Sequence, residues 1–332
     1  MKRPLLLPLV SLYAAGLALR EMRLHRGWEP VRRLRYPVIS VGNLSTGGSG
    51  KTPLTITLAQ LLSARGFHVD VLSRGYGRAS HAAARVRPEG TVEEFGDEPL
   101  LIAREAKVPV YVAAERFDAG QLAEADAANQ NDGYPRVHIL DDGFQHRQLA
   151  RNVDILLVNR EDWNDHLLPA GNLREGLQAA KRASVLAIPA DDAGFEDDLR
   201  KWGWTGPVWR IRRRMELPQI DGPVAAFCGI ARPEQFFAGL ERAGLAPVIR
   251  QIFADHHRFT VTDVESLVAR ARVAGVATLI TTQKDEIRLG KLVSALPASL
   301  SLRAARLTVS IEDDSQTCEW LVGRLSVRNA EA

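Results

Sequence analysis

A glycine-rich segment near the first sixth of the chain carries residue types that bind phosphate. It follows an apolar run at 37–41 and precedes leucines at helical spacing, so a strand, a turn and a helix are predicted in that order. In such an arrangement backbone N–H groups and the helix N-terminus face a polyphosphate, Lys51 contacts the β- and γ-phosphates, and the Thr52 hydroxyl binds Mg²⁺. The predicted nucleotide-binding residues are Ser45, Thr46, Gly47, Gly48, Ser49, Gly50, Lys51 and Thr52.

This segment departs from the usual phosphate-binding pattern at one position. Ser45 stands where a glycine is expected, although Gly47 and Gly48 can supply the same backbone freedom. A flexible Gly/Ser loop that binds nothing is the alternative interpretation. The flanking strand and helix favour a nucleoside triphosphate site.

Two adjacent carboxylates, Asp141 and Asp142, follow a strand pattern at 137–140. In proteins with a phosphate-binding loop, a carboxylate at the end of a neighbouring strand helps to hold Mg²⁺. Paired aspartates before a glycine also form turns, which is the structural alternative. The upstream loop favours a metal role for at least one of the two.

A second acidic pair, Asp97 and Glu98, precedes a helical pattern at 98–106. Asp97 could simply cap that helix, or it could be a general base for a substrate hydroxyl. One histidine of the run Asp255-His256-His257, after a later strand pattern, could orient such a carboxylate, or it could be an ordinary surface or core histidine. Spacing alone leaves these alternatives open. Zinc is not expected, because no cysteine accompanies the histidines.

The run 282–285, Thr-Gln-Lys-Asp, resembles the guanine-binding motif of GTPases only superficially. Lys284 and Asp285 are adjacent, so the carboxylate lacks the required spacing. These residues could line a base pocket, but guanine specificity is not expected.

Short apolar runs alternate with helical patterns along the first two-thirds of the chain. This alternation predicts an α/β fold with a doubly wound, mostly parallel sheet of the P-loop NTPase type, followed by a second, smaller α/β domain. The basic, Pro- and Gly-bearing stretch 210–222 is interpreted as a connector. The predicted domains are residues 1–35, 36–212 and 213–332. Ligands are expected beyond the carboxyl ends of the strands and between the domains.

The N-terminal segment combines an uncharged, Leu-rich run at 4–19 with six arginines between residues 20 and 35. Sixteen helical residues rise only about 24 Å, less than a bilayer core of roughly 30 Å, so a spanning helix is not expected. A signal peptide is disfavoured because a nucleotide site follows closely. The run is interpreted as a helix on a membrane surface or, alternatively, as an ordinary helix with a solvated face.

Composition excludes several classes of function. A net charge of +3, without a basic run interleaved with aromatics, argues against a nucleic-acid partner. The chain has two cysteines, Cys228 and Cys318, which lie far apart and indicate a reducing compartment without structural zinc.

Several of these segments, taken in order, resemble one family, the tetraacyldisaccharide 4′-kinases that act in lipid A biosynthesis in Gram-negative bacteria. The Asp-Asp-Gly-Phe-Gln-His-Arg block is the most specific of them, and the resemblance covers almost the whole chain. The matching segments are Gly42-Asn43-Leu44 with the loop up to Pro53, 73–77 (Ser-Arg-Gly-Tyr-Gly), 96–99 (Gly-Asp-Glu-Pro), 140–147, 168–175, 255–257 and 282–285.

The resemblance implies an ATP-dependent lipid kinase that phosphorylates the 4′-hydroxyl of a tetraacylated glucosamine disaccharide 1-phosphate. It places the protein peripherally at the cytosolic face of the inner membrane, without an obligate protein partner. By analogy Asp97 is the base, His256 pairs with it, and Lys51 serves catalysis. Glu98 with Asp141 or Asp142, or both, serves the metal and phosphates. Weaker candidates for binding the sugar or its 1-phosphate are Arg74, Tyr76, Arg116 and Gln145.

Three positions depart from the family's pattern. Asn152 and Asn159 stand where acids are expected, and Gly176 stands where proline is usual. They lie outside the predicted base pair and phosphate loop, so they bear on local loop shape. Two alternative functions are a nucleotide-dependent switch or metallochaperone acting through a protein partner, and a membrane scaffold with a vestigial nucleotide site.

Overall fold

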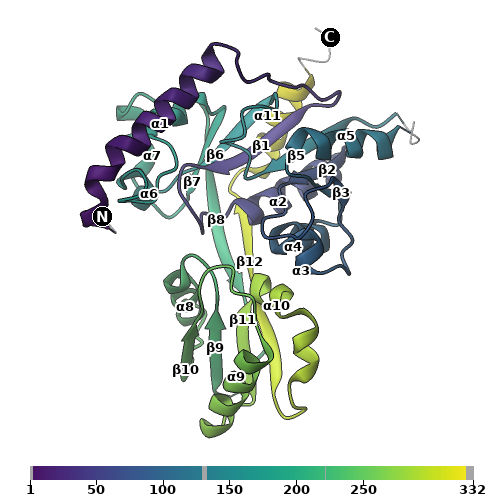
Figure 1. Cartoon of the computed structure of the whole chain (residues 1–332), viewed down its shortest axis with the longest axis vertical. Helices are drawn as coiled ribbons and strands as arrows, with labels where there is room; N and C mark the ends of the chain where they lie inside the picture. Colours follow the sequence, from purple (N-terminus) through teal and green to yellow (C-terminus); the bar gives the residue numbers. More distant parts are fainter. Residues whose placement is uncertain (1–2, 129–132, 221, 327–332) are drawn as a thin grey trace.

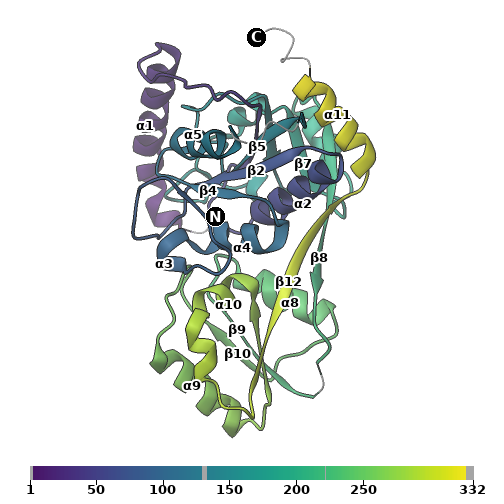
Figure 2. The same cartoon turned by 90° about the vertical axis from the view of Figure 1, so that its right-hand side faces the viewer.

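The computed structural model describes residues 3–128, 133–220 and 222–326. A large lobe and a small lobe are joined by two long strands (Figures 1 and 2). Within the described residues one sheet runs through both lobes in the order β10-β9-β11-β12-β8-β7-β6-β1-β5-β2-β4-β3. Its strands are β1 Val38–Asn43, β2 His68–Ser73, β3 Ala84–Arg85, β4 Val110–Val112, β5 Arg136–Asp141, β6 Val153–Leu157, β7 Val185–Pro189, β8 Val208–Glu216, β9 Val224–Cys228, β10 Ile249–Ile252, β11 Thr278–Thr282 and β12 Ser301–Ile311.

Helices cover both faces of the large-lobe sheet, as a doubly wound fold requires. One core joins β1, β2, β5 and β6 to the helices at Lys51–Ala64 (α2) and Asp97–Ala106 (α4). Cores on the opposite face join the sheet to the helices at Arg116–Ala127 (α5) and Phe195–Lys201 (α7). The predicted α/β fold with a mostly parallel sheet is confirmed. The helices are α1 Leu7–His25, α2 Lys51–Ala64, α3 Val92–Phe95, α4 Asp97–Ala106, α5 Arg116–Ala127, α6 Arg160–Trp163, α7 Phe195–Lys201, α8 Pro233–Arg242, α9 Val261–Val273, α10 Gln283–Leu289 and α11 Asp314–Ser326, with 3₁₀ turns at Pro4–Leu6, Leu177–Arg182 and Gly290–Ala295.

The central strand β1 is fully buried and pairs in parallel with β5 on one side and β6 on the other. Because β2 also runs parallel to β5, the loops after β1, β2 and β5 emerge at one edge of the sheet. That edge carries the glycine-rich loop, Arg74 and the pair Asp141–Asp142. Parallel pairing therefore gathers residues that lie about a hundred positions apart in the chain.

The stretch predicted as a connector, 210–222, is mostly strand. β8 runs to Glu216 and pairs antiparallel with β12, from Ile211 opposite Ile311 to Glu216 opposite Arg306. Arg210, Arg212 and Arg214 alternate outward along this strand. A strand pair with one face exposed to solvent can carry basic side chains on that face. The many arginines in this stretch therefore do not indicate a loop. β8 and β12 are the physical link between the lobes (Figure 1).

The last described helix, α11, returns to the large lobe. Leu321 and Leu325 of α11 belong to the main core, together with Val309 and Ile311 of β12. The predicted small domain, 213–332, therefore includes a segment that packs on the other lobe. Local patterns identify an amphipathic helix, but they do not identify the sheet that buries it.

The N-terminal helix is longer than its uncharged run. The helical segment Pro4–His25 has 22 residues, about 33 Å at ~1.5 Å per residue, so its length and composition suffice to cross a membrane. The length argument against spanning is wrong for this helix. However, α1 is docked on the large lobe: the Tyr13 hydroxyl donates to the Arg174 carbonyl at 2.9 Å, and Arg20 donates to the Gln145 carbonyl at 2.5 Å.

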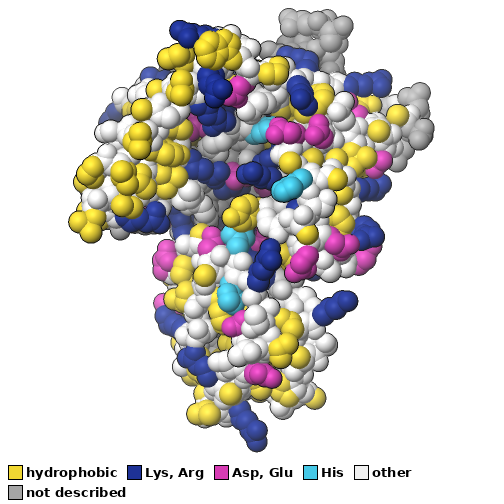
Figure 3. All heavy atoms as spheres, in the orientation of Figure 1, with side chains coloured by type: hydrophobic (Ala, Val, Ile, Leu, Met, Phe, Trp, Pro, Cys, Tyr) yellow, Lys and Arg dark blue, Asp and Glu magenta, His cyan; other side chains and the backbone are white. Residues whose placement is uncertain are grey.

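The opposite side of α1 carries apolar side chains into solvent. Figure 3 shows hydrophobic side chains gathered along this helix at the upper left, with basic groups beside them. The most exposed of them are Leu5 (93%), Leu12 (73%), Leu19 (53%) and Leu9 (49%). Arg32 lies 3.6 Å from Asp118, and Arg20 donates to the Gln145 carbonyl, so both arginines contact the large lobe.

Candidate active site

The glycine-rich loop has the backbone that the sequence predicts. Gly47, Gly48 and Gly50 all have positive φ, and α2 begins directly after them at Lys51. The Lys51 ammonium donates to Asn43 Oδ1 at 3.0 Å and lies 3.6 Å from Asp142 Oδ1. A loop of this shape presents main-chain N–H groups at a helix N-terminus, which is an anion site.

The serine that departs from the pattern has a role in the loop. The Ser45 hydroxyl donates to Asp162 Oδ2 at 2.7 Å and accepts from the Asn43 amide at 3.0 Å. Arg232 of the small lobe binds the same carboxylate through Oδ1 at 2.5 Å. A Cβ at Gly47 would come within 2.5 Å of the Ala231 methyl. The small lobe therefore packs directly on the loop, and Ser45 ties the loop to the residue that anchors that contact.

The two aspartates after β5 have different partners. Asp142 accepts two hydrogen bonds from Arg174, both at 3.1 Å, whereas Asp141 accepts from the Thr55 hydroxyl at 3.1 Å. Burial, then the charges of Glu98 and Asp142, raise the pKa of Asp141 to about 7. Burial opposes ionisation of Asp142 too, but Lys51 and Arg174 outweigh it and lower its pKa. Asp141 is thus a buried carboxylate without a guanidinium partner among the residues that the structure describes.

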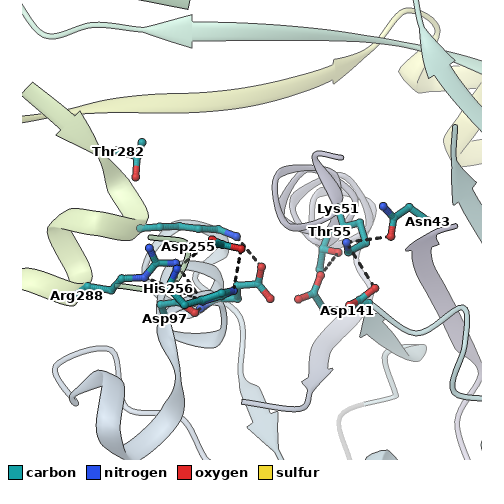
Figure 4. Close-up of polar contacts among 12 residues, drawn as sticks. Asn43, Lys51, Thr55, Asp97, Asp141, Asp255, His256, Thr282 and Arg288 are labelled. Carbon is teal, nitrogen blue, oxygen red and sulfur yellow. Dashed lines mark hydrogen bonds and ion pairs between the residues drawn. The ribbon is translucent and has the colours of Figure 1, made fainter. Parts of the chain in front are cut away.

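Asp97 and His256 meet across the two lobes. His256 Nδ1 lies 3.2 Å from Asp97 Oδ2, and Asp97 Oδ1 accepts the Glu98 backbone N–H at 2.9 Å (Figure 4). Asp97 is the first residue of α4 rather than its cap, which is Gly96. Burial would raise the pKa of Asp97, but the His256 hydrogen bond and the charges of Arg288 and Lys284 lower it. His256 has φ of 56°, an uncommon conformation for a non-glycine residue.

Other residues of the predicted motifs have structural partners. Lys284 forms an ion pair with Glu98 at 2.6 Å, which joins α10 to α4 across the lobes. Asp285 is fully buried and accepts from the Thr282 hydroxyl at 2.7 Å, so it does not face a base pocket. His257 lies 3.0 Å from Asp263.

A cavity of about 1560 Å³ contains the phosphate loop, and a smaller one of about 630 Å³ contains Asp97. The two share the walls formed by Arg74, Tyr76, His256 and Arg288, so they are parts of one cleft. All four predicted substrate residues line this cleft: Arg74, Tyr76, Arg116 and Gln145. Figure 4 shows Lys51 and Asp141 in one group and Asp97 and His256 in another, in the same region.

A sequence model described as tetraacyldisaccharide-1-P 4′-kinase, LpxK, matches residues 2–326. The chain belongs to this family. It is 44% identical to the tetraacyldisaccharide 4′-kinase of Koribacter versatilis over 95% of this chain and 97% of that one. It is 37% identical to the enzyme of that name from Anaeromyxobacter sp., over 93% and 86% of the two chains. It is also similar to a crystal structure of Aquifex aeolicus LpxK in complex with ATP, with a TM-score of 0.75, 32% identity, and coverage of 98% and 100%.

Four residues that complete this kinase-family site were not predicted from the sequence. Asn43 and Arg174 hold Lys51 and Asp142, Asp162 holds the phosphate loop, and Arg288 binds Asp97. Asn43 and Arg174 lie inside the segments that resemble the family, but the sequence does not show which side chains they contact. For Arg288 no sequence signal existed, because its partner lies 191 residues away.

Proposed function

We propose that this protein transfers the γ-phosphate of ATP to the 4′-hydroxyl of a tetraacyldisaccharide 1-phosphate. The observation that carries the proposal is the Asp97–His256 contact in the same cleft as a phosphate loop, in a chain of this kinase family. Asp97 accepts the hydroxyl proton as the hydroxyl oxygen bonds to the γ-phosphorus. The bond from the γ-phosphorus to the β–γ bridging oxygen breaks, and ADP leaves with that electron pair.

A weakly basic carboxylate suits this reaction. Phosphoryl transfer passes through a loose transition state, in which little charge develops on the attacking oxygen before the leaving bond breaks. Positioning and charge neutralisation then matter more than base strength. His256 holds the Asp97 carboxylate in place from the other lobe, and Lys51 with the loop N–H groups neutralises the phosphates.

Mg²⁺ fits the phosphate end of the cleft. No group of three or more His, Cys, Asp or Glu side chains within the described residues could hold a metal unaided. Mg²⁺ needs no such cage, because it is usually bound by one or two carboxylates together with phosphates and water. Asp141 is buried and, within the described part of the chain, is not bonded to a guanidinium, so Asp141 with Thr52 would hold the ion. When bound, the ion neutralises charge on the transferred phosphate.

The acceptor phosphate has a natural place beside Arg116. This guanidinium is buried, its Nε has no hydrogen-bond partner among the described residues, and burial followed by the charge of Arg74 lowers its pKa to about 10. Two guanidiniums that destabilise each other favour a bound anion. The sugar 1-phosphate is the anion that the substrate supplies.

The test is a reaction of the purified protein with radiolabelled ATP, Mg²⁺ and the disaccharide lipid in detergent, with products resolved by thin-layer chromatography. We expect a labelled bisphosphorylated lipid from the wild type. The Asp97→Asn variant should bind ATP normally and lose most turnover. Labelled phosphate released without lipid labelling, and stimulated by a protein instead, would assign the chain to the nucleotide-dependent switches. Replacing Mg²⁺ by Mn²⁺ allows binding to be followed by electron paramagnetic resonance, where Asp141→Asn should weaken it.

The protein would meet this acyl-chain substrate as a peripheral protein on the cytosolic face of the inner membrane. Tyr13 and Arg20 bond α1 to the large lobe, and Leu5, Leu9, Leu12 and Leu19 are exposed to solvent. A helix docked in this way lies along the protein and offers an apolar face to a bilayer surface. The exposed arginines beside it would add about 1 kcal/mol each near anionic lipid.

Vesicle flotation tests this placement. We expect Leu5→Asp/Leu12→Asp to abolish co-flotation with anionic vesicles, while Val273→Asp, at a site 91% exposed on the small lobe, leaves it unchanged. Alkaline carbonate should release the bound wild type, since a peripheral helix is extracted and a spanning one is retained. Equal flotation of all variants would contradict the proposal.

A further inference from the structure

Arg288 makes the closest set of contacts to the proposed catalytic carboxylate. Its Nε donates to Asp97 Oδ2 at 2.7 Å, and its Nη2 donates to the same oxygen and lies 3.2 Å from His256 Nδ1 (Figure 4). Both donors reach Asp97 from the small lobe, because Arg288 lies on α10. The side chains of Arg288 and Asp97 are only 4% and 3% exposed.

The guanidinium is itself fixed on its other edge. Nη1 donates to Asp285 Oδ1 at 2.9 Å and to the Gly229 carbonyl at 2.5 Å. Asp285 is held in turn by the Thr282 hydroxyl at 2.7 Å and the Gly229 N–H at 3.1 Å. The carboxylate of Asp97 is therefore bonded to a planar group that has no freedom to rotate.

We propose that Arg288 is a positioning residue, which holds the Asp97 carboxylate in the one rotamer that faces the acceptor hydroxyl. The inference rests on the proposed function of Asp97 as base. Oδ1 of this carboxylate accepts the Glu98 N–H and Oδ2 contacts His256, so without Arg288 the position of Oδ2 would depend on one hydrogen bond from a partly exposed imidazole. The two donors of the fixed guanidinium converge on Oδ2 and restrict rotation of the carboxylate.

The experiment compares Arg288→Ala and Arg288→Lys with Arg306→Ala. Arg306 is the control, because it also joins α4 to a distant element, through Glu105 at 2.6 Å, without touching Asp97; its side chain is 45% exposed, against 4% for Arg288. We expect Arg288→Ala to lower kcat about 10²-fold with KM for ATP unchanged, the cost of displacing a reacting group by roughly 1 Å. Arg288→Lys should restore less than a tenth of the loss, and added guanidinium should raise kcat of Arg288→Ala at least tenfold.

Several results would overturn the inference. A wild-type kcat in Arg288→Ala would do so, as would losses of kcat, ATP affinity and melting temperature that match those of Arg306→Ala. A wild type without lipid kinase activity would refute the proposed function instead. In that case thermal unfolding still tests the contact between Arg288 and Asp97. The loss of melting temperature caused by Arg288→Ala should be smaller in an Asp97→Asn background than in the wild type. Equal losses in both backgrounds would refute the contact.

Discussion

His138, on the buried strand β5, lies between two carboxylates outside the active-site cleft. Its Nδ1 is 2.5 Å from Asp70 Oδ1, and its Nε2 is 3.4 Å from Glu124 Oε1. The imidazole is only 1% exposed. Burial would lower the pKa of His138, but the charges and hydrogen bonds of the two carboxylates raise it to about 9. The folded protein therefore holds an imidazolium here at neutral pH.

This pair of contacts predicts a pH-dependent stability with a definite sign. A histidine whose pKa is raised on folding contributes its full stability below its unfolded pKa of about 6.5 and loses it as pH rises through the folded value. The window is therefore roughly pH 6.5 to 9. The shift from 6.5 to about 9 is about 2.5 units, or on the order of 3 kcal/mol at ~1.4 kcal/mol per unit.

Urea unfolding followed by tryptophan fluorescence measures this contribution. The six tryptophans are Trp28, Trp163, Trp202, Trp204, Trp209 and Trp320, which all lie outside residues 217–306, so the signal reports the large lobe. We expect the wild type to lose on the order of 3 kcal/mol more than His138→Gln between pH 6.5 and 9. His166→Gln, at an exposed position, is the control and should follow the wild type. Parallel curves for wild type and His138→Gln would refute the reasoning.

Three further predictions concern substitutions at Lys51, Gly47 and Gly176. Lys51→Ala should lower kcat/KM in the lipid kinase assay about 10²-fold or more, since it removes the charge at the phosphates. Gly47→Ala should weaken ATP binding, measured by calorimetry, because its Cβ would meet Ala231 at 2.5 Å and its φ is 75°; adding Ala231→Gly should recover only the steric part. Gly176 has φ of −66° and open space at Cβ, so Gly176→Pro should raise the free energy of unfolding in urea by about 0.5–1 kcal/mol.

Much of the large lobe could be predicted from the sequence because its strands are buried on both faces. Such strands appear as short apolar runs, and β1, β5 and β7 lie within about two residues of their predicted bounds. β8 and β12 were missed for the converse reason: a two-stranded ribbon with a solvent-exposed face carries arginines instead of an apolar run. The place of α11 was also beyond prediction, because it depends on how β12 returns between the lobes.

The parts of the site that are formed by neighbouring residues in the chain could be predicted from the sequence. The phosphate loop is a contiguous strand, turn and helix, so its backbone follows from a few adjacent residues. The contact between Asp97 and His256 joins residues 159 apart, and only the family resemblance linked them. Two of the three departures from the family pattern have local hydrogen-bond partners: Asn152 accepts the Val38 N–H at 3.0 Å, and Asn159 caps α6 through the Asp162 N–H at 2.8 Å.

The arrangement of partners also indicates why the two lobes must be held in one orientation. Asp97 belongs to the large lobe, yet His256 and Arg288, which fix it, belong to the small lobe. The phosphate loop likewise belongs to the large lobe, and Arg232 of the small lobe holds it through Asp162. A rotation of the lobes about β8 and β12 would break both sets of contacts together. The positions of the Asp97 carboxylate and of the phosphate loop therefore both depend on the angle between the two lobes.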